Sequence, residues 1–217
     1  IEQALGDRAH QAKYLEANWF DSTVFLNRGD RFEARLLPVE AQMSPAFAVC
    51  VADFDGDGNE DAFLSQNFFG TRAETSRYDA GRGLLLRGDG HGDFAAVAGQ
   101  ESGLLIYGEQ RGAVAADYDG DGRVDLAVTQ LGGETKLYHN ETAHPGLRVH
   151  VKGQAIGAIL RLKNGDQFGA AREIHNSTIQ VMAARATRAS IQIRWPGGKV
   201  TETPVPPNAR EITVARE

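Results

Sequence analysis

Cysteine is almost absent from this chain, and other features that would direct its classification are scarce too. Cys50 is the single cysteine among 217 residues, so no intrachain disulfide can form and a disulfide-based scaffold is excluded. There are seven prolines, and no apolar run is long enough to cross a bilayer. We therefore expect no membrane span in this chain.

An excess of positive charge is also lacking. Lysine and arginine total 23 against 29 acidic residues, which gives a formal net charge of −6. Nucleic-acid binding needs a clustered basic face, so nucleic acid is not an expected partner. The chain begins at Ile1 without a methionine or a signal peptide, and we expect it to be a fragment or a mature piece of a longer protein.

Glycine is abundant, and it marks an internal repeat. With 25 glycines, the chain has the composition of many tight turns between short strands. Two matching segments, residues 52–62 and 116–126, each carry alternating aspartates and two glycines. Short apolar runs precede and follow both segments, and such runs bounded by turn signals predict β-strands.

A second repeated element accompanies the acidic segments. Residues 24–27 lead through a glycine turn to Phe32, and residues 84–87 lead through a similar turn to Phe94. Residues 137–140 begin a third copy. The unit has four strands in roughly 60 residues, the size of one propeller blade. We predict blades at residues 44–97 and 112–145, within a blade region of residues 21–145 that starts with a partial blade.

The two ends of the chain have different patterns. Residues 2–17 carry apolar residues at helical spacing, which predicts a short helix in a lead-in of residues 1–20. After Gly146 the acidic loops stop and alternating segments follow, which predicts a small antiparallel β module over residues 146–217. The expected fold class is all-β, with propeller-type blades followed by this module and a possible short N-terminal helix.

The acidic segments have the ligand pattern of a calcium site. Carboxylates so close together repel one another unless a cation lies between them. Oxygen ligands without histidine or cysteine favour calcium over zinc or copper. The expected side-chain ligands, at positions one, three, five and nine of each loop, are Asp53, Asp55, Asp57 and Asp61, and then Asp117, Asp119, Asp121 and Asp125.

The backbone carbonyl at position seven, from Asn59 or Arg123, is expected to complete each site together with water. The loops are not EF-hands, because position twelve is Leu64 or Val128 instead of glutamate, and strands flank them. A solvated Asp/Gly turn without a metal is the alternative interpretation. We predict two structural Ca²⁺ sites.

Both parts of the chain resemble known families. The loops, with their flanking apolar strands, resemble FG-GAP/VCBS repeats, the calcium-loop blades of integrin-alpha-like propellers. Gly146-Leu147-Arg148-Val149, Ile156-Gly157-Ala158 and Trp195-Pro196-Gly197-Gly198 resemble the ASPIC/UnbV domain that often follows such repeats in bacterial exported proteins. The loops near Gln154 and after Asn176 are shorter than the family pattern. The resemblance implies a blade scaffold and brings no catalytic residues with it.

The expected function is a non-enzymatic scaffold for adhesion, protein–protein interaction or complex assembly. Its partners would be a protein, a surface glycan or other subunits of an extracytoplasmic assembly. We expect a secreted, periplasmic or cell-surface location in a bacterium. The alternative is a carbohydrate-binding or calcium-dependent polysaccharide-active protein that uses the long loop 66–82. The candidate residues in that loop are Arg72, Arg77, Tyr78 and Asp79.

Two kinds of short motif have simpler interpretations. Arg28-Gly29-Asp30 and Arg87-Gly88-Asp89 spell an adhesion tripeptide, but both lie in the glycine turn of the repeat, so turn chemistry explains them. Asn140-Glu141-Thr142 and Asn176-Ser177-Thr178 fit the glycosylation pattern, and we expect unmodified polar turns there.

Overall fold

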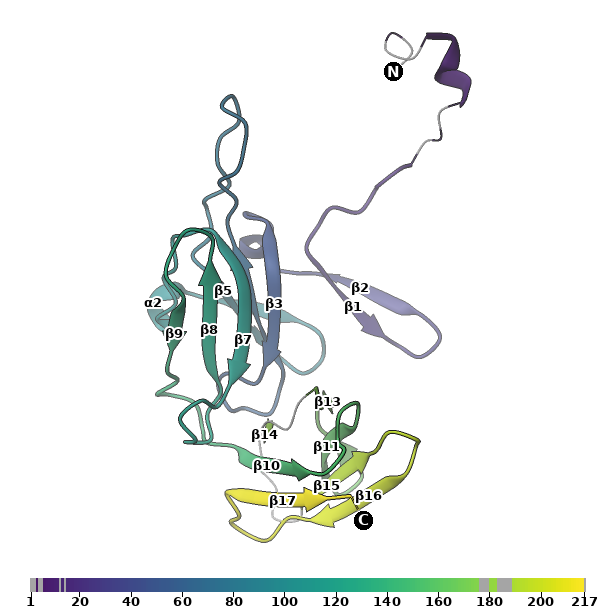
Figure 1. Cartoon of the computed structure of the whole chain (residues 1–217), viewed down its shortest axis with the longest axis vertical. Helices are drawn as coiled ribbons and strands as arrows, with labels where there is room; N and C mark the ends of the chain where they lie inside the picture. The colour runs from purple at the N-terminus through teal and green to yellow at the C-terminus, as the bar shows by residue number, and fades with distance from the viewer. Residues whose placement is uncertain are drawn as a thin grey trace.

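The fold is built from short β-strands, as a computed structural model of the chain shows (Figure 1). The structure describes residues 3, 6–11, 13, 15–175, 180–182 and 189–216. The all-β prediction is confirmed, with α2 (Gly99–Ser102) a single turn. In the lead-in, Gly6–Gln11 forms a 3-10 helix, while residues 2, 4, 5, 12 and 14 of the predicted helical stretch, and residue 1 before it, lie outside the described part.

The first repeat forms an antiparallel sheet with a hairpin before it. The N-terminal hairpin pairs β1 (Thr23–Asn27) with β2 (Phe32–Leu36). The first sheet consists of β3 (Ala46–Ala52), β4 (Asp61–Gln66), β5 (Leu84–Gly88) and β6 (Phe94–Val97), in chain order. Every residue of β4 is buried, because both faces of this strand are covered.

The second sheet repeats this arrangement with one strand fewer. It consists of β7 (Gln110–Ala116), β8 (Asp125–Gln130) and β9 (Lys136–Tyr138). The two sheets share one apolar core, in which Cys50 and Phe63 of the first sheet join Leu126 and Val128 of the second. The other face of the first sheet packs Leu64 and Leu86 against Ala41. The sheets therefore stack face to face.

The C-terminal module has its own core and two small sheets. One sheet has the order β14-β10-β17, and the other has the order β12-β11-β15-β16 with β13 paired to β11. The strands are β10 (Leu147–Lys152), β11 (Ile159–Asn164), β12 (Gln167–Phe168), β13 (Arg172–Glu173), β14 (Gln180–Met182), β15 (Ala189–Arg194), β16 (Val200–Pro204) and β17 (Glu211–Ala215). The pairs are antiparallel except β10–β17, which is parallel. Trp195 is buried in this core, and its indole Nε1 donates to Thr201 Oγ1 at 2.8 Å.

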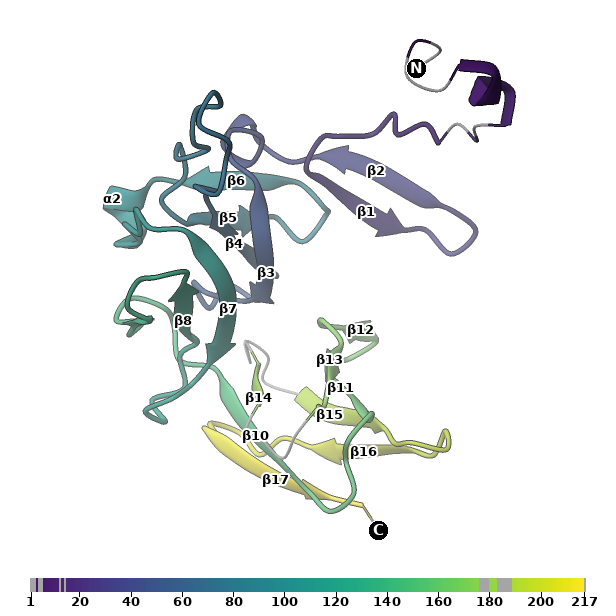
Figure 2. The same cartoon turned by 45° about the horizontal axis from the view of Figure 1, so that its top comes forward.

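The acidic segments lie where the two sheets meet the C-terminal module (Figures 1 and 2). Each segment connects the first two strands of its sheet, β3 to β4 and β7 to β8. The loop of residues 66–82 projects from the opposite end of the first sheet (Figure 1). No helix in the described part of the chain is long and apolar enough to cross a membrane.

Candidate metal centre

Three carboxylates converge in the first loop. Oxygen atoms of Asp53, Asp55 and Asp57 all lie within 4.8 Å of one another. The backbone turns around Asp53, whose oxygens accept from the N–H groups of Asp57 (3.0 Å) and Gly58 (2.9 Å). Each carboxylate oxygen has a further lone pair available for a ligand. The geometry suits a cation that binds at 2–2.6 Å from several oxygens.

The second loop repeats this geometry with one added ligand type. Asp117, Asp119 and Asp125 bring their oxygens within 4.8 Å of one another, and so do Asp119, Asp121 and His139 with their ligand atoms. Asp117 is again the centre of the turn, since it accepts from the N–H groups of Gly120 (2.8 Å) and Gly122 (3.1 Å). Both loops therefore contain acidic clusters that could hold a metal ion.

The ninth-position aspartates brace the loops in the same way. Asp61 accepts from the N–H groups of Phe54 (2.8 Å) and Gly88 (2.9 Å). Asp125 accepts from the equivalent N–H groups of Tyr118 (3.0 Å) and Asn140 (2.8 Å). Asp61 accepts from backbone N–H groups and is not part of the Asp53, Asp55 and Asp57 cluster. Asp125 has both roles, because it accepts from backbone N–H groups and also belongs to the cluster with Asp117 and Asp119.

Burial makes negative charge unfavourable at several of these carboxyls. Desolvation raises the pKa of Asp61 to about 6, against the lowering effect of its two backbone hydrogen bonds. Desolvation also raises the pKa of Asp53 and that of the neighbouring Glu60. A bound cation would relieve this penalty, because it stabilises the charged form of each carboxyl.

A basic side chain faces the third position of each loop. Arg87 Nε lies 2.9 Å from Asp55, and His139 Nε2 lies 2.9 Å from Asp119. Strand register makes Arg87 and His139 equivalent, because Leu86 pairs with Ala62 just as Tyr138 pairs with Leu126. The sequence analysis named no histidine among the expected ligands and so missed His139. The sequence feature that could have identified His139 is its position directly after β9, the third strand of the repeat.

The position-seven residues take different parts in the two loops. The N–H of Asn59 donates to Asp57 at 2.8 Å, and the N–H of Arg123 donates to Asp121 at the same distance. The Arg123 guanidinium also pairs with Asp121 and donates from Nε to the Ala143 carbonyl at 2.9 Å. Desolvation raises the pKa of Asp121, but hydrogen bonds from the backbone and the side chain of Arg123 lower this pKa by more. The pKa of Asp121 is therefore below its ordinary value.

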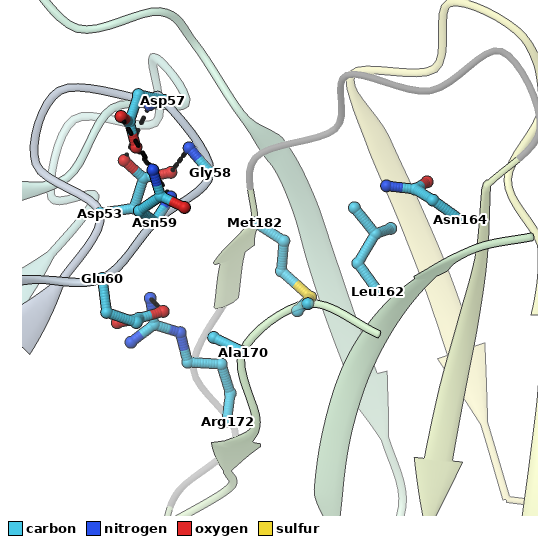
Figure 3. Close-up of a pocket in the computed structure, with 11 residues that line it drawn as sticks. Asp53, Asp57, Gly58, Asn59, Glu60, Leu162, Asn164, Ala170, Arg172 and Met182 are labelled. Carbon is cyan, nitrogen blue, oxygen red and sulfur yellow. Dashed lines mark hydrogen bonds and ion pairs between the residues drawn. The ribbon is translucent and has the colours of Figure 1, made fainter. Parts of the chain in front are cut away.

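Two arginines of the C-terminal module reach into the loop region. Arg148 Nε lies 3.1 Å from Asp117, whose side chain is buried, and Arg172 lies 2.7 Å from Glu60. Figure 3 shows Arg172 directed at Glu60, below the first loop. Here a cavity of about 220 Å³ separates that loop from Leu162 and Met182 of the module. The acidic loops therefore form part of the contact between the sheets and the module.

The other candidate residues from the sequence lie apart from the loops. Arg72, Arg77, Tyr78 and Asp79 are exposed in the projecting loop, where Phe68 and Tyr78 form an isolated bridge. Arg77 stacks over Phe69 at 4.9 Å and lies 4.0 Å from Asp79.

The short motifs have structural partners. Arg28 pairs with Glu33 at 2.9 Å, and the Asn140 amide donates to two backbone carbonyls. A Cβ at Gly88 would lie 2.1 Å from the Glu60 carbonyl oxygen, so this glycine is required by packing. The sequon at Asn176 lies outside the described residues.

Comparison with protein-family models and with curated proteins finds no match to this chain.

Proposed function

We propose that this chain is a non-enzymatic, calcium-binding blade module that serves as a scaffold for protein–protein interaction, adhesion or complex assembly. The observation that carries the proposal is the repetition of one loop geometry in two stacked sheets. Both loops turn around their first aspartate and are braced through their ninth. Such repetition favours a structural role, because a catalytic site has no need to occur twice at equivalent places.

Calcium is the metal that fits these loops best. Each cluster offers hard carboxylate oxygens from alternate residues, the donor set that Ca²⁺ prefers. His139 adds a softer donor to the second loop only, and the first loop has no imidazole in its cluster. We assign the ligands to Asp53, Asp55 and Asp57 and to Asp117, Asp119, Asp121 and Asp125, with the carbonyls of Asn59 and Arg123 as further donors.

We retain the resemblance to FG-GAP/VCBS repeats and to the ASPIC/UnbV domain as part of the proposal. The feature that favours the first is the acidic loop that connects the first two strands of each of the two sheets. This resemblance implies a module of an exported bacterial protein. Calcium sites of modest affinity fill where calcium is about millimolar, outside the cytosol. Fractionation of cells that make the full-length protein is expected to find it in the periplasm, at the surface or in the medium. Recovery from the cytosol alone would contradict this location.

Calorimetric titration with calcium tests the metal assignment. The wild-type chain is expected to bind two ions, and Asp57→Ala and Asp121→Ala are each expected to lose one. Asp79→Ala is the matched control, because Asp79 is an aspartate on the projecting loop, away from both clusters. Absence of calcium heat in the wild type, or equal loss in the control, would contradict the proposal.

A carbohydrate-binding role remains the second candidate, and one feature favours it. The projecting loop presents the half-exposed ring of Tyr78 and the stacked pair Arg77–Phe69. Rings and guanidinium groups of this kind are suited to contact sugars. A glycan array is expected to show binding that Tyr78→Ala abolishes if this candidate is correct, and uronide cleavage would indicate an enzyme instead.

A further inference from the structure

Among the described residues, the second sheet has no counterpart of β6, the fourth strand of the first sheet. The first sheet runs β3-β4-β5-β6, whereas the second ends at β9, whose outer edge pairs with no strand among the described residues. We propose that this edge, together with the cavity beside it, accepts an extended peptide segment of a partner protein as a fourth strand. The inference rests on the proposed scaffold function and names its interaction surface.

The two sheets are equivalent up to the point where they diverge. Gly88 ends β5 and Asn140 lies two residues after the end of β9, and both donate their N–H to the ninth aspartate of their loop. After Gly88 the chain turns back and forms β6. After Asn140 it leaves for the C-terminal module instead.

The side chain of Asn140 holds this different path. Its amide donates to the carbonyls of Phe54 (2.7 Å) and Val124 (3.0 Å), one beside each acidic loop. The N–H of His144 then donates to the Asp55 carbonyl at 3.3 Å. The chain is thereby directed along the loops and leaves β9 uncovered.

A cavity of about 580 Å³ lies between the two sheets beside this edge. Apolar side chains from both sheets and from the segment after α2 line part of it, among them Leu85, Val97, Leu104, Leu126 and Tyr138, and polar side chains such as Arg87, Glu101 and His139 line the rest. A cavity with an apolar part beside unpaired strand groups is suited to β-strand addition, in which main-chain hydrogen bonds give affinity and side-chain pockets give specificity.

The first sheet predicts which peptide fits. On β6, Ala96 pairs with Leu86 and Phe94 pairs with Gly88, and both Phe94 and Ala96 pack on the core of that face. The equivalent strand on β9 would place a small residue opposite Tyr138 and an aromatic residue opposite Asn140. Since Tyr138 lines the cavity, these two side chains would enter it. The partner segment is therefore extended, with an aromatic and a small residue two positions apart.

Disulfide capture tests the proposal in calcium-containing buffer. The probe is a peptide with the sequence of residues 90–98, in which the residue at the Val97 position is cysteine. Val97 pairs with Leu85, the equivalent of Leu137, and paired Cα atoms on antiparallel strands lie within disulfide range. The protein variant is Leu137→Cys, and the matched control is Val114→Cys, because these side chains are similarly exposed at 57% and 59% on the same sheet.

We expect at least about tenfold more capture at position 137 than at position 114, with a return to the control level when the peptide carries alanine in place of the aromatic residue. Equal capture at both positions, or capture that ignores the aromatic residue, would overturn the proposal. Selective shifts of the Tyr138 and His139 resonances with oligosaccharides, beside equal capture, would assign the cavity to a glycan instead. Calcium titration of the same variants separates this outcome from failure of the metal proposal.

Discussion

At the scale of single residues, the aspartates of one loop have separate tasks. Asp61 is almost fully buried and satisfies two backbone donors, whereas Asp57 is half-buried and belongs to the cation cluster. The sequence predicted both as ligands, because spacing along the chain shows which residues are near the turn. It does not show which carboxylate will accept the hydrogen bonds of the backbone N–H groups.

This difference predicts distinct mutational effects. Asp61→Ala leaves two backbone N–H groups without their acceptor, and each such loss costs about 1–3 kcal/mol. We expect destabilisation of similar size with calcium and with EGTA. Asp57→Ala is expected to lower stability chiefly in calcium. Urea unfolding of both variants in both buffers measures this, and a calcium-dependent effect of Asp61→Ala alone would contradict the assignment.

Glu33 allows a prediction of pH dependence away from the metal loops. Hydrogen bonds from Arg28 and Arg35 lower the pKa of Glu33 to about 2 from its ordinary 4.5. Because the folded-state pKa is depressed, the stabilisation is present above pH 4.5 and is lost as the pH falls towards 2. NMR titration is expected to place Glu33 near 2 and to move it upward in Arg28→Ala. An unchanged titration in that variant would contradict the pairing.

At the scale of elements, the sequence predicted the strands well and their partners less well. Residues 147–151 and 211–214 alternate clearly, but only the folded structure shows that β10 and β17 pair in parallel. The pattern of apolar residues aligns residues 137–140 with residues 84–87, which matches Asn140 to Arg87. The register instead matches His139 to Arg87, one residue earlier. The strand direction and the register both depend on pairing between residues far apart in the chain, and the local sequence pattern carries no information about that pairing.

The first loop also depends on a close approach that only glycine permits. Gly56 and Gly103 both have φ of +73°, but a Cβ at Gly56 would lie 2.5 Å from the His144 carbonyl oxygen, whereas nothing lies within 4 Å at Gly103. Gly103→Ala is expected to cost about 1 kcal/mol for its left-handed backbone. Gly56→Ala should cost clearly more, because it also displaces the backbone at His144. Equal losses in chemical unfolding would show that this contact is unimportant.

At the scale of the whole molecule, the metal loops and the C-terminal module belong to one junction. The order of sheets and module followed from the repeat and from its end after Gly146. The contacts of Arg148 and Arg172 with the loop region could not be predicted from the sequence, because an arginine on an alternating strand gives no indication of its distant partner. Calcium binding and attachment of the module are therefore expected to be linked.

Arg172→Ala tests this linkage, because it leaves the half-buried Glu60 beside the loop without its cation. Limited proteolysis is expected to cleave between the sheets and the module faster than in the wild type, and calcium should restore only part of the protection. Arg161→Ala is the control, since Arg161 lies on an exposed position of β11. Identical cleavage rates in both variants would indicate that the junction does not depend on this pair.

Thermal unfolding with calcium and with EGTA tests the central claim, that each acidic loop holds one structural Ca²⁺, most directly. With Kd on the order of 10⁻⁴ M and calcium at about 1 mM, each site contributes roughly 1.4 kcal/mol. For a chain of this size, two sites correspond to about 5–10 °C. We predict a fall of this size in EGTA, about half of it in Asp121→Ala. An identical melting temperature in both buffers would contradict the account.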